Sequence, residues 1–143
     1  MQITIQIQSG EVEKLLDRLM NLSYAEPLRD AAVYMKSSVL RNFEIGGRPP
    51  WRPLSAKTLM EKLKKGYSPQ PLIRTGRLRQ SINISVGENE ASVLPGVRYG
   101  AYHQFGTDRI PARPFLVFQP EDVAVIQQIF ANYIARVLGG EGA

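Results

Sequence analysis

The sequence contains no cysteine, one histidine and one tryptophan among its 143 residues. Without cysteine there are no disulfides, thiolate metal sites or cysteine nucleophiles. Asp108 is the one acid within ten residues of His103, so neither a zinc site nor a Ser-His-Asp triad is complete, and a packing role suits this histidine better. Paired carboxylates and phosphate-binding glycine motifs are also missing. We therefore expect no catalytic residues, no metal and no cofactor.

Long hydrophobic runs are missing as well. The longest uncharged stretch near the end, residues 123–135, includes two glutamines and one asparagine and is shorter than the roughly 20 apolar residues that cross a bilayer. The first residues lack the basic and apolar regions of an export signal. The length and the 43% hydrophobic content predict a single domain over residues 1–138, followed by a flexible tail at 139–143. We expect no membrane contact.

Charge is distributed unevenly along the chain. The formal net charge is +5, yet residues 1–30 carry three bases against five acids, and residues 83–143 carry four against six. Residues 31–82 carry eleven bases and only two acids, Glu44 and Glu61. All excess positive charge therefore lies in the middle third, where phosphates, an acidic protein surface or water are its alternative partners.

Hydrophobic spacing predicts a strand and three helices. Gln2–Gln8 alternates isoleucines with polar residues, which is typical of a half-buried strand. Helical spacing predicts a short helix after Ser9-Gly10 and a longer one from about Pro27 to Glu44 that Gly46-Gly47 ends. A C-terminal helix begins at the acids Glu121 and Asp122 and ends at Gly139-Gly140.

Shorter elements lie between the long helices. Residues 46–55 contain two glycines and three prolines and must form a loop. Ser55 is expected to cap a helix through Lys65 with Leu59 and Leu63 facing inward, and Thr75 to cap a turn of helix that carries Leu78 and Ile82. Strands are predicted at 83–86, 91–94 and 115–118, the first two joined by a hairpin-like loop. The order predicts an α+β domain, with a small, mainly antiparallel sheet packed against two long helices and a proline-rich loop.

The basic middle third surrounds the single tryptophan. Arginines and lysines around an aromatic platform suit single-stranded nucleic acid, so a nucleic-acid-binding module that uses residues 41–65 and Trp51 is one hypothesis. The alternative makes Trp51 a hydrophobic anchor, for its own loop or for a neighbouring subunit, with its indole N–H hydrogen-bonded. An enzyme that depends on His103 or a carboxylate is a third hypothesis without a supporting motif.

Three stretches resemble the bacteriophage virion morphogenesis family, the tail-completion and head-tail joining proteins of Mu-like and P2-like phages. They are GGRPPWRPLSAKT at 46–58, LIRTGRLRQSI at 72–82 and YGAYHQFGTDRIPARPFL at 99–116. The resemblance implies a structural, non-enzymatic protein that assembles as a homo-oligomeric ring of six subunits. Such a ring ends the tail tube, contacts tail-tube and head-tail connector proteins, and lets genomic DNA pass without sequence-specific binding. It implies assembly in the host bacterial cytoplasm and a final place in the tail or neck of the virion.

The matched stretches supply nine candidate residues for contacts with a subunit or partner: Arg48, Trp51, Arg52, Arg77, Tyr99, His103, Arg109, Arg113 and Phe115. Pro111 and Pro114 fix the backbone on either side of Arg113, which suits a bidentate carboxylate pair across an interface. Pairing of Arg113 within its own chain is the alternative. Tyr99 likewise suits core packing as well as binding. We expect most of the basic charge to face a neighbouring subunit or the outside of a ring rather than its channel.

Overall fold

A computed structural model describes residues 2 and 9–139 of the chain. In these residues six helices and one antiparallel hairpin follow one another in the order α1 (Ser9–Asn21), α2 (Ala25–Ile45), α3 (Ala56–Lys64), α4 (Arg77–Gln80), β1 (Ile82–Val86), β2 (Ala91–Pro95), α5 (Gly100–Phe105) and α6 (Pro120–Leu138). The predicted α+β class is confirmed. The strand predicted over Gln2–Gln8 lies, apart from Gln2, outside the described residues, as does the predicted tail apart from Gly139.

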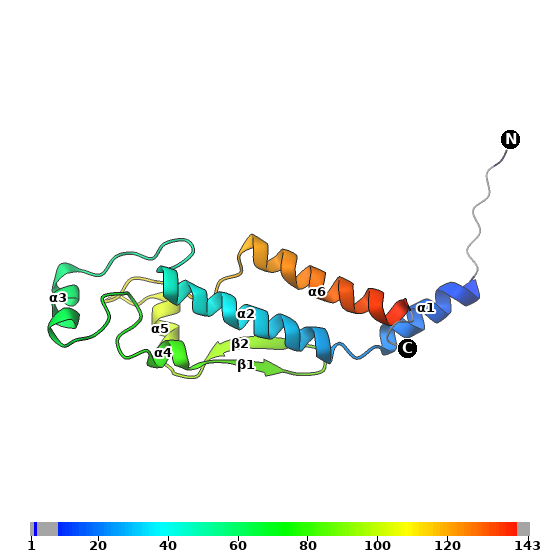
Figure 1. The fold of residues 1–143 in the computed structure, drawn as a ribbon, viewed down its shortest axis with the longest axis horizontal. Helices are drawn as coiled ribbons and strands as arrows, with labels where there is room; N and C mark the ends of the chain where they lie inside the picture. Colours follow the sequence, from blue (N-terminus) through cyan, green and yellow to red (C-terminus); the bar gives the residue numbers. More distant parts are fainter. Residues whose placement is uncertain (1, 3–8, 140–143) are drawn as a thin grey trace.

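Helix α2 is the centre of the fold. The hairpin packs on one side of it and α6 runs antiparallel to it on another (Figure 1). The register pairs Ile82 with Pro95 and Val86 with Ala91, which closes the hairpin at residues 87–90. Gly46 ends α2 in the left-handed conformation at φ 84° and donates its N–H to the Asn42 carbonyl, a backbone state that glycine adopts without strain.

The core lies where α2 meets the hairpin and the loops. Its buried members are Val39, Phe43, Trp51, Leu78, Ile82 and Phe115. The Phe43 ring meets Trp51 edge-on at 5.7 Å and Phe115 at 5.4 Å between centroids. These three aromatic rings bind the proline-rich loop and the segment before α6 to the C-terminal half of α2.

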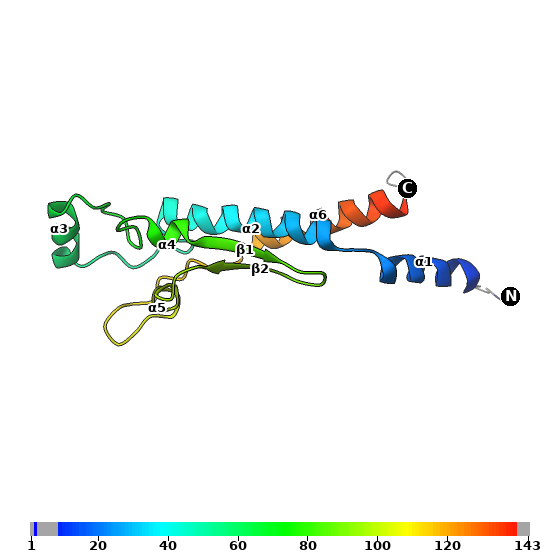
Figure 2. The ribbon, with the colours of Figure 1, turned by 90° about the horizontal axis from the view of Figure 1, so that it is seen from below.

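The molecule is elongated, with α1 at one end and α3 at the other (Figures 1 and 2). Helix α1 exposes apolar side chains along its length, among them Leu15, Leu16 and Met20, the last 82% exposed. Arg18 fastens this helix to the end of α6 through a 2.9 Å hydrogen bond from Nη2 to the Val137 carbonyl. Among the described residues, nothing buries the apolar stripe of α1.

Three expectations for local structure were wrong, and one helix was not expected at all. Residues 115–118 form no strand, because the Phe115 and Leu116 amides donate to the side chain of Gln104 rather than to another strand. Helix α4 begins after Gly76 with no side-chain cap, so Thr75 does not cap it. In α3, capped by Ser55 as predicted, Leu63 is 54% exposed. The neighbouring Lys62 takes the inward position. Helix α5 was not anticipated.

Candidate functional site: a basic cleft

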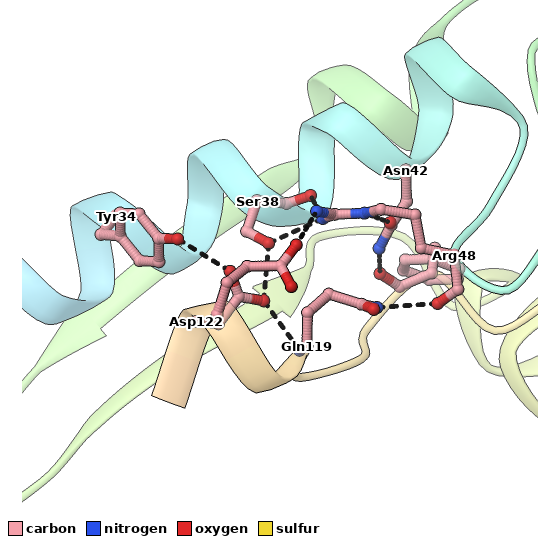
Figure 3. A network of polar contacts seen from close by, with 8 residues as sticks. Tyr34, Ser38, Asn42, Arg48, Gln119 and Asp122 are labelled. Atoms are coloured by element: carbon pink, nitrogen blue, oxygen red, sulfur yellow. Dashed lines mark hydrogen bonds and ion pairs between the residues drawn. The ribbon is translucent and has the colours of Figure 1, made fainter. Parts of the chain in front are cut away.

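A buried polar network holds the start of the proline-rich loop against α2 and α6. Arg48 donates from Nε to Asn42 Oδ1 at 2.7 Å, and from Nη2 to the Ser38 carbonyl and hydroxyl, both at 2.7 Å (Figure 3). Asp122 at the start of α6 accepts from Tyr34 at 2.9 Å, Ser38 at 2.8 Å and the Gln119 amide at 2.9 Å. We call these six residues, Tyr34, Ser38, Asn42, Arg48, Gln119 and Asp122, the Arg48 network.

The network lowers the pKa of the Asp122 carboxyl. Burial by itself raises this pKa, but the Gln119 amide, the Ser38 and Tyr34 hydroxyls and the charge of Arg48 together outweigh it. The hydrogen bond that the Tyr34 hydroxyl donates to Asp122 raises the pKa of the Tyr34 phenol. Among the described residues, no buried side-chain polar atom lacks a hydrogen-bond partner. The network is therefore a satisfied structural joint that fixes where the loop leaves α2.

Beyond this joint, three loops and the short helices α3, α4 and α5 line an open cleft of about 980 Å³. It lies at the end of the molecule that carries α3, α4 and α5 (Figure 1). Its walls consist of residues 52–55, 58, 62, 72–75, 77, 78, 99, 103, 107–111 and 113. Six of these are arginines or lysines and one, Asp108, is an acid. We call this site the basic cleft.

Arg113 ties two of the cleft loops, residues 52–55 and 107–113, together. Its Nε donates to the Arg52 carbonyl at 2.7 Å and its Nη2 to the Pro53 carbonyl at 3.1 Å, while its amide donates to the His103 carbonyl at 2.7 Å. The guanidinium therefore binds backbone oxygens of its own chain, the alternative that the sequence left open. Burial, followed by the charge of Arg52, lowers the pKa of Arg113.

Two of the cations that line the cleft, Lys62 and Arg113, are buried. Lys62 is almost fully buried and donates from Nζ to the Gln70 carbonyl at 2.6 Å. Burial lowers its pKa first, and the charges of Arg74 and Arg113 lower it further. Burial and Arg113 also lower the pKa of His103, so the imidazole is neutral at neutral pH. This mutual repulsion among cations favours an anionic occupant of the cleft.

Three guanidinium groups remain free to meet such an occupant. Arg52, Arg77 and Arg109 are exposed on the cleft walls, and their side chains make no hydrogen bond or ion pair with the residues that the structure describes. Arg74 is already paired with Glu61 at 2.7 Å. The cleft can thus bind carboxylates or phosphates, and it holds no paired base and nucleophile for chemistry among its wall residues.

The structure divides the nine predicted contact residues into two sets. Six of them line the basic cleft: Arg52, Arg77, Tyr99, His103, Arg109 and Arg113. The other three, Arg48, Trp51 and Phe115, have partners inside the chain. Trp51 donates its indole N–H to the Pro114 carbonyl at 2.7 Å and is 8% exposed, so the hypothesis that it forms a stacking platform for nucleic acid is wrong.

Sequence reasoning missed two residues that build the cleft. Lys62 was placed on a basic surface and instead lies inside the wall. Gln104 accepts from the Phe115 and Leu116 amides at 3.0 Å each and donates to the Leu116 carbonyl at 3.1 Å, which fixes the strand-like segment behind the cleft. Gln104 stands in the family-like stretch at 99–116, but no periodicity indicates that its side chain holds this segment, so only the fold shows that role.

The sequence of the chain is similar to that of a known protein family. The model of the phage virion morphogenesis family matches residues 7–135. The chain belongs to this family. The resemblance seen in its three sequence stretches is confirmed, and with it a structural role in phage virion morphogenesis and an association with the virion. The family is one of structural proteins rather than of known enzymes.

Two relatives from Haemophilus influenzae extend over the same length. Mu-like prophage FluMu G protein 2 is 38% identical over 146 residues, which cover 95% of this chain and 99% of the relative. Mu-like prophage FluMu G protein 1 is 26% identical and covers 96% of this chain and 98% of its own. No solved structure matches the chain. Among the described residues, no helix is long and apolar enough to span a membrane.

Proposed function

We propose that this protein completes the phage tail at the head-tail junction, as a homo-oligomeric ring of six subunits. The ring ends growth of the tail tube and presents a surface to the head-tail connector. It assembles in the host bacterial cytoplasm and remains in the neck of the virion. Genomic DNA passes through it without sequence-specific contacts.

The observation that carries this proposal, beside family membership, is a subunit with different chemistry at its two ends. One end carries α1, with an apolar stripe that the other described residues leave exposed and that includes Val12, Leu15, Leu16 and Met20. The other carries the basic cleft. An isolated amphipathic helix of 13 residues is marginal in water, so the stripe of α1 favours burial on a partner. Unlike ends make head-to-tail contacts, and such contacts produce rings when the rotation closes.

The nucleic-acid-binding alternative rests on the same cleft. Three free arginines could neutralise phosphates, and binding through them would weaken steeply with added salt. The interior position of Trp51 removes its aromatic platform. The cleft is also a concave site at one end of the molecule rather than a stripe of cations that follows a phosphate backbone.

The proposal is tested on purified protein with native mass spectrometry and electron microscopy, alone and mixed with tail tubes. We expect rings that attach to one end of each tube. In a phage that lacks the protein we expect tails of uncontrolled length. Tails of normal length that fail to join filled heads would assign the ring to the head side, and a monomer that ignores tube ends at high concentration would refute the proposal.

A further inference from the structure

The tip of the hairpin is negatively charged, whereas the basic cleft is positively charged. Glu88 and Glu90 lie in the loop between β1 and β2, where the Gly87 amide donates to the Glu90 carbonyl at 2.8 Å. Both glutamates are exposed, and neither makes an ion pair with the described residues. The tip is therefore a narrow, rigid projection with two free carboxylates.

The tip and the cleft lie at opposite ends of the same element. Helix α4 with Arg77 directly precedes β1 at one end of the hairpin, and the acidic tip closes the other end, beside the start of α2 (Figure 1). Five strand residues at about 3.3 Å each separate them by about 16 Å. The tip therefore cannot enter the cleft of its own chain.

We propose that the Glu88–Glu90 tip of one subunit docks into the basic cleft of a second copy of this chain. Arg77 and Arg109, together with Arg52, receive the two carboxylates as charge-assisted, bidentate pairs. The inference rests on the proposed ring, for which it supplies the contact between neighbours.

Size and charge both support this occupant. The cleft, at about 980 Å³, is at the upper end of the roughly 300–1,000 Å³ of ligand sites, and the tip is a short turn between two strands about 5 Å apart. Burial and, after it, neighbouring cations lower the pKa of Lys62 and Arg113, and a carboxylate placed there offsets this concentration of positive charge. Because the two surfaces differ, the contact is heterologous and repeats from subunit to subunit.

A charge-exchange experiment tests the pairing. Glu88→Lys with Glu90→Lys, or Arg77→Glu with Arg109→Glu, should each weaken self-association by about tenfold or more, because like charges then face each other. A mixture of the two double variants should associate again in alternation, because the unchanged tip meets the unchanged cleft and the lysine tip meets the glutamate cleft. The matched control, Asp30→Lys with Glu44→Lys at exposed positions of α2, keeps the same net charge as the tip variant and should leave association unchanged.

Disulfide trapping gives a readout that does not depend on ring closure. The chain has no cysteine, so Asn89→Cys at the tip and Thr75→Cys on the cleft wall form a unique pair. Mixed and mildly oxidised, these two variants should give a covalent dimer. Asn89→Cys mixed with Asn132→Cys, on the exposed face of α6, should give far less.

The outcomes separate the two proposals. If the wild-type protein forms rings but the two cysteine variants give no tip-to-cleft disulfide, or if neither double variant weakens the rings, the docking inference is overturned and the proposed ring is not affected. A tip-to-cleft disulfide in a protein that forms only open chains would support the docking and count against a closed ring. Salt-dependent binding of a single-stranded DNA oligonucleotide that Arg77→Glu with Arg109→Glu abolishes, in a protein whose tip variant associates normally, would assign the cleft to phosphates instead.

Discussion

Ser38 and Asp122 lie 84 positions apart in the sequence, and the Ser38 hydroxyl donates a 2.8 Å hydrogen bond to Oδ2 of the buried Asp122 carboxylate. The same hydroxyl accepts from Arg48 Nη2 at 2.7 Å. The Ser38 hydroxyl thus bridges the Arg48 guanidinium of the loop and the Asp122 carboxylate of α6. This bridge lies where α2, α6 and the proline-rich loop meet (Figure 3). The stability of the fold should depend on this joint.

The first prediction concerns Asp122 and acid. Asp122→Asn turns an amide N–H₂ toward groups that donate, so we expect a loss of about 2 kcal/mol in the free energy of unfolding near neutral pH. Because the folded pKa lies below the ordinary value near 3.9, wild-type stabilisation is present above about pH 4 and is lost as the pH falls through the folded pKa. The difference between wild type and variant should therefore shrink in acid.

Urea unfolding at about pH 7 and about pH 3, followed by the fluorescence of the single, buried Trp51, measures this difference. Glu121→Gln is the control, because the neighbouring carboxylate is mostly exposed and lies 3.5 Å from Arg48. Its effect should stay within about 0.5 kcal/mol. An equal gap between Asp122→Asn and wild type at both pH values would contradict the assignment.

The second prediction concerns the shape of the Arg48 side chain. Arg48→Lys keeps the charge but cannot reach Asn42 and Ser38 at the same time, since these contacts use separate nitrogens of one planar group. We expect unfolding to become easier by about 2 kcal/mol in a urea titration. Arg41→Lys, on the exposed side of α2, should change the free energy of unfolding little. Equal effects at the two positions would show that the network adds nothing.

Much of this fold was predictable from periodicity. The residue spacings that predicted α1, α2, α6 and the hairpin act over one or two turns or one strand, where the burial of a single face decides the conformation. Residues 115–118 alternate like a strand yet pair with the side chain of Gln104. Backbone groups need partners, and a sequence pattern does not state which chemical group supplies them.

The candidate site, like the fold, was predictable only in part. Six of the nine predicted contact residues meet in one cleft, because the motif around 99–116 and the loop at 52–55 are tied by Arg113. Trp51 and Phe115 occur in the same motifs but serve the core. Short motifs combine residues that shape a surface with residues that support it from beneath. Only packing distinguishes the two, as it also distinguishes buried Lys62 from exposed Leu63 in α3.

The third prediction tests the side chain that replaces a strand. Gln104→Ala removes the acceptor of the Phe115 and Leu116 amides, so we expect a loss of about 2 kcal/mol in unfolding free energy. Those two amides should exchange their hydrogens much faster in NMR hydrogen-exchange measurements. Gln127→Ala, on the exposed side of α6, is the control. Unchanged protection at residues 115 and 116 would show that Gln104 does not hold this segment.

The fourth prediction separates backbone strain from steric clash at two adjacent glycines. Gly46 and Gly47 have φ of 84° and 98°, so alanine is strained at both. A Cβ at Gly46 meets nothing within 4 Å, whereas one at Gly47 lies 2.5 Å from Trp51 Cδ1. We expect a loss of about 1 kcal/mol for Gly46→Ala and about 3 kcal/mol for Gly47→Ala, measured by urea unfolding. Because the indole must move to admit the methyl group, only Gly47→Ala should shift Trp51 emission to longer wavelength. Equal losses with unchanged emission would mean that Trp51 is not seated against this glycine.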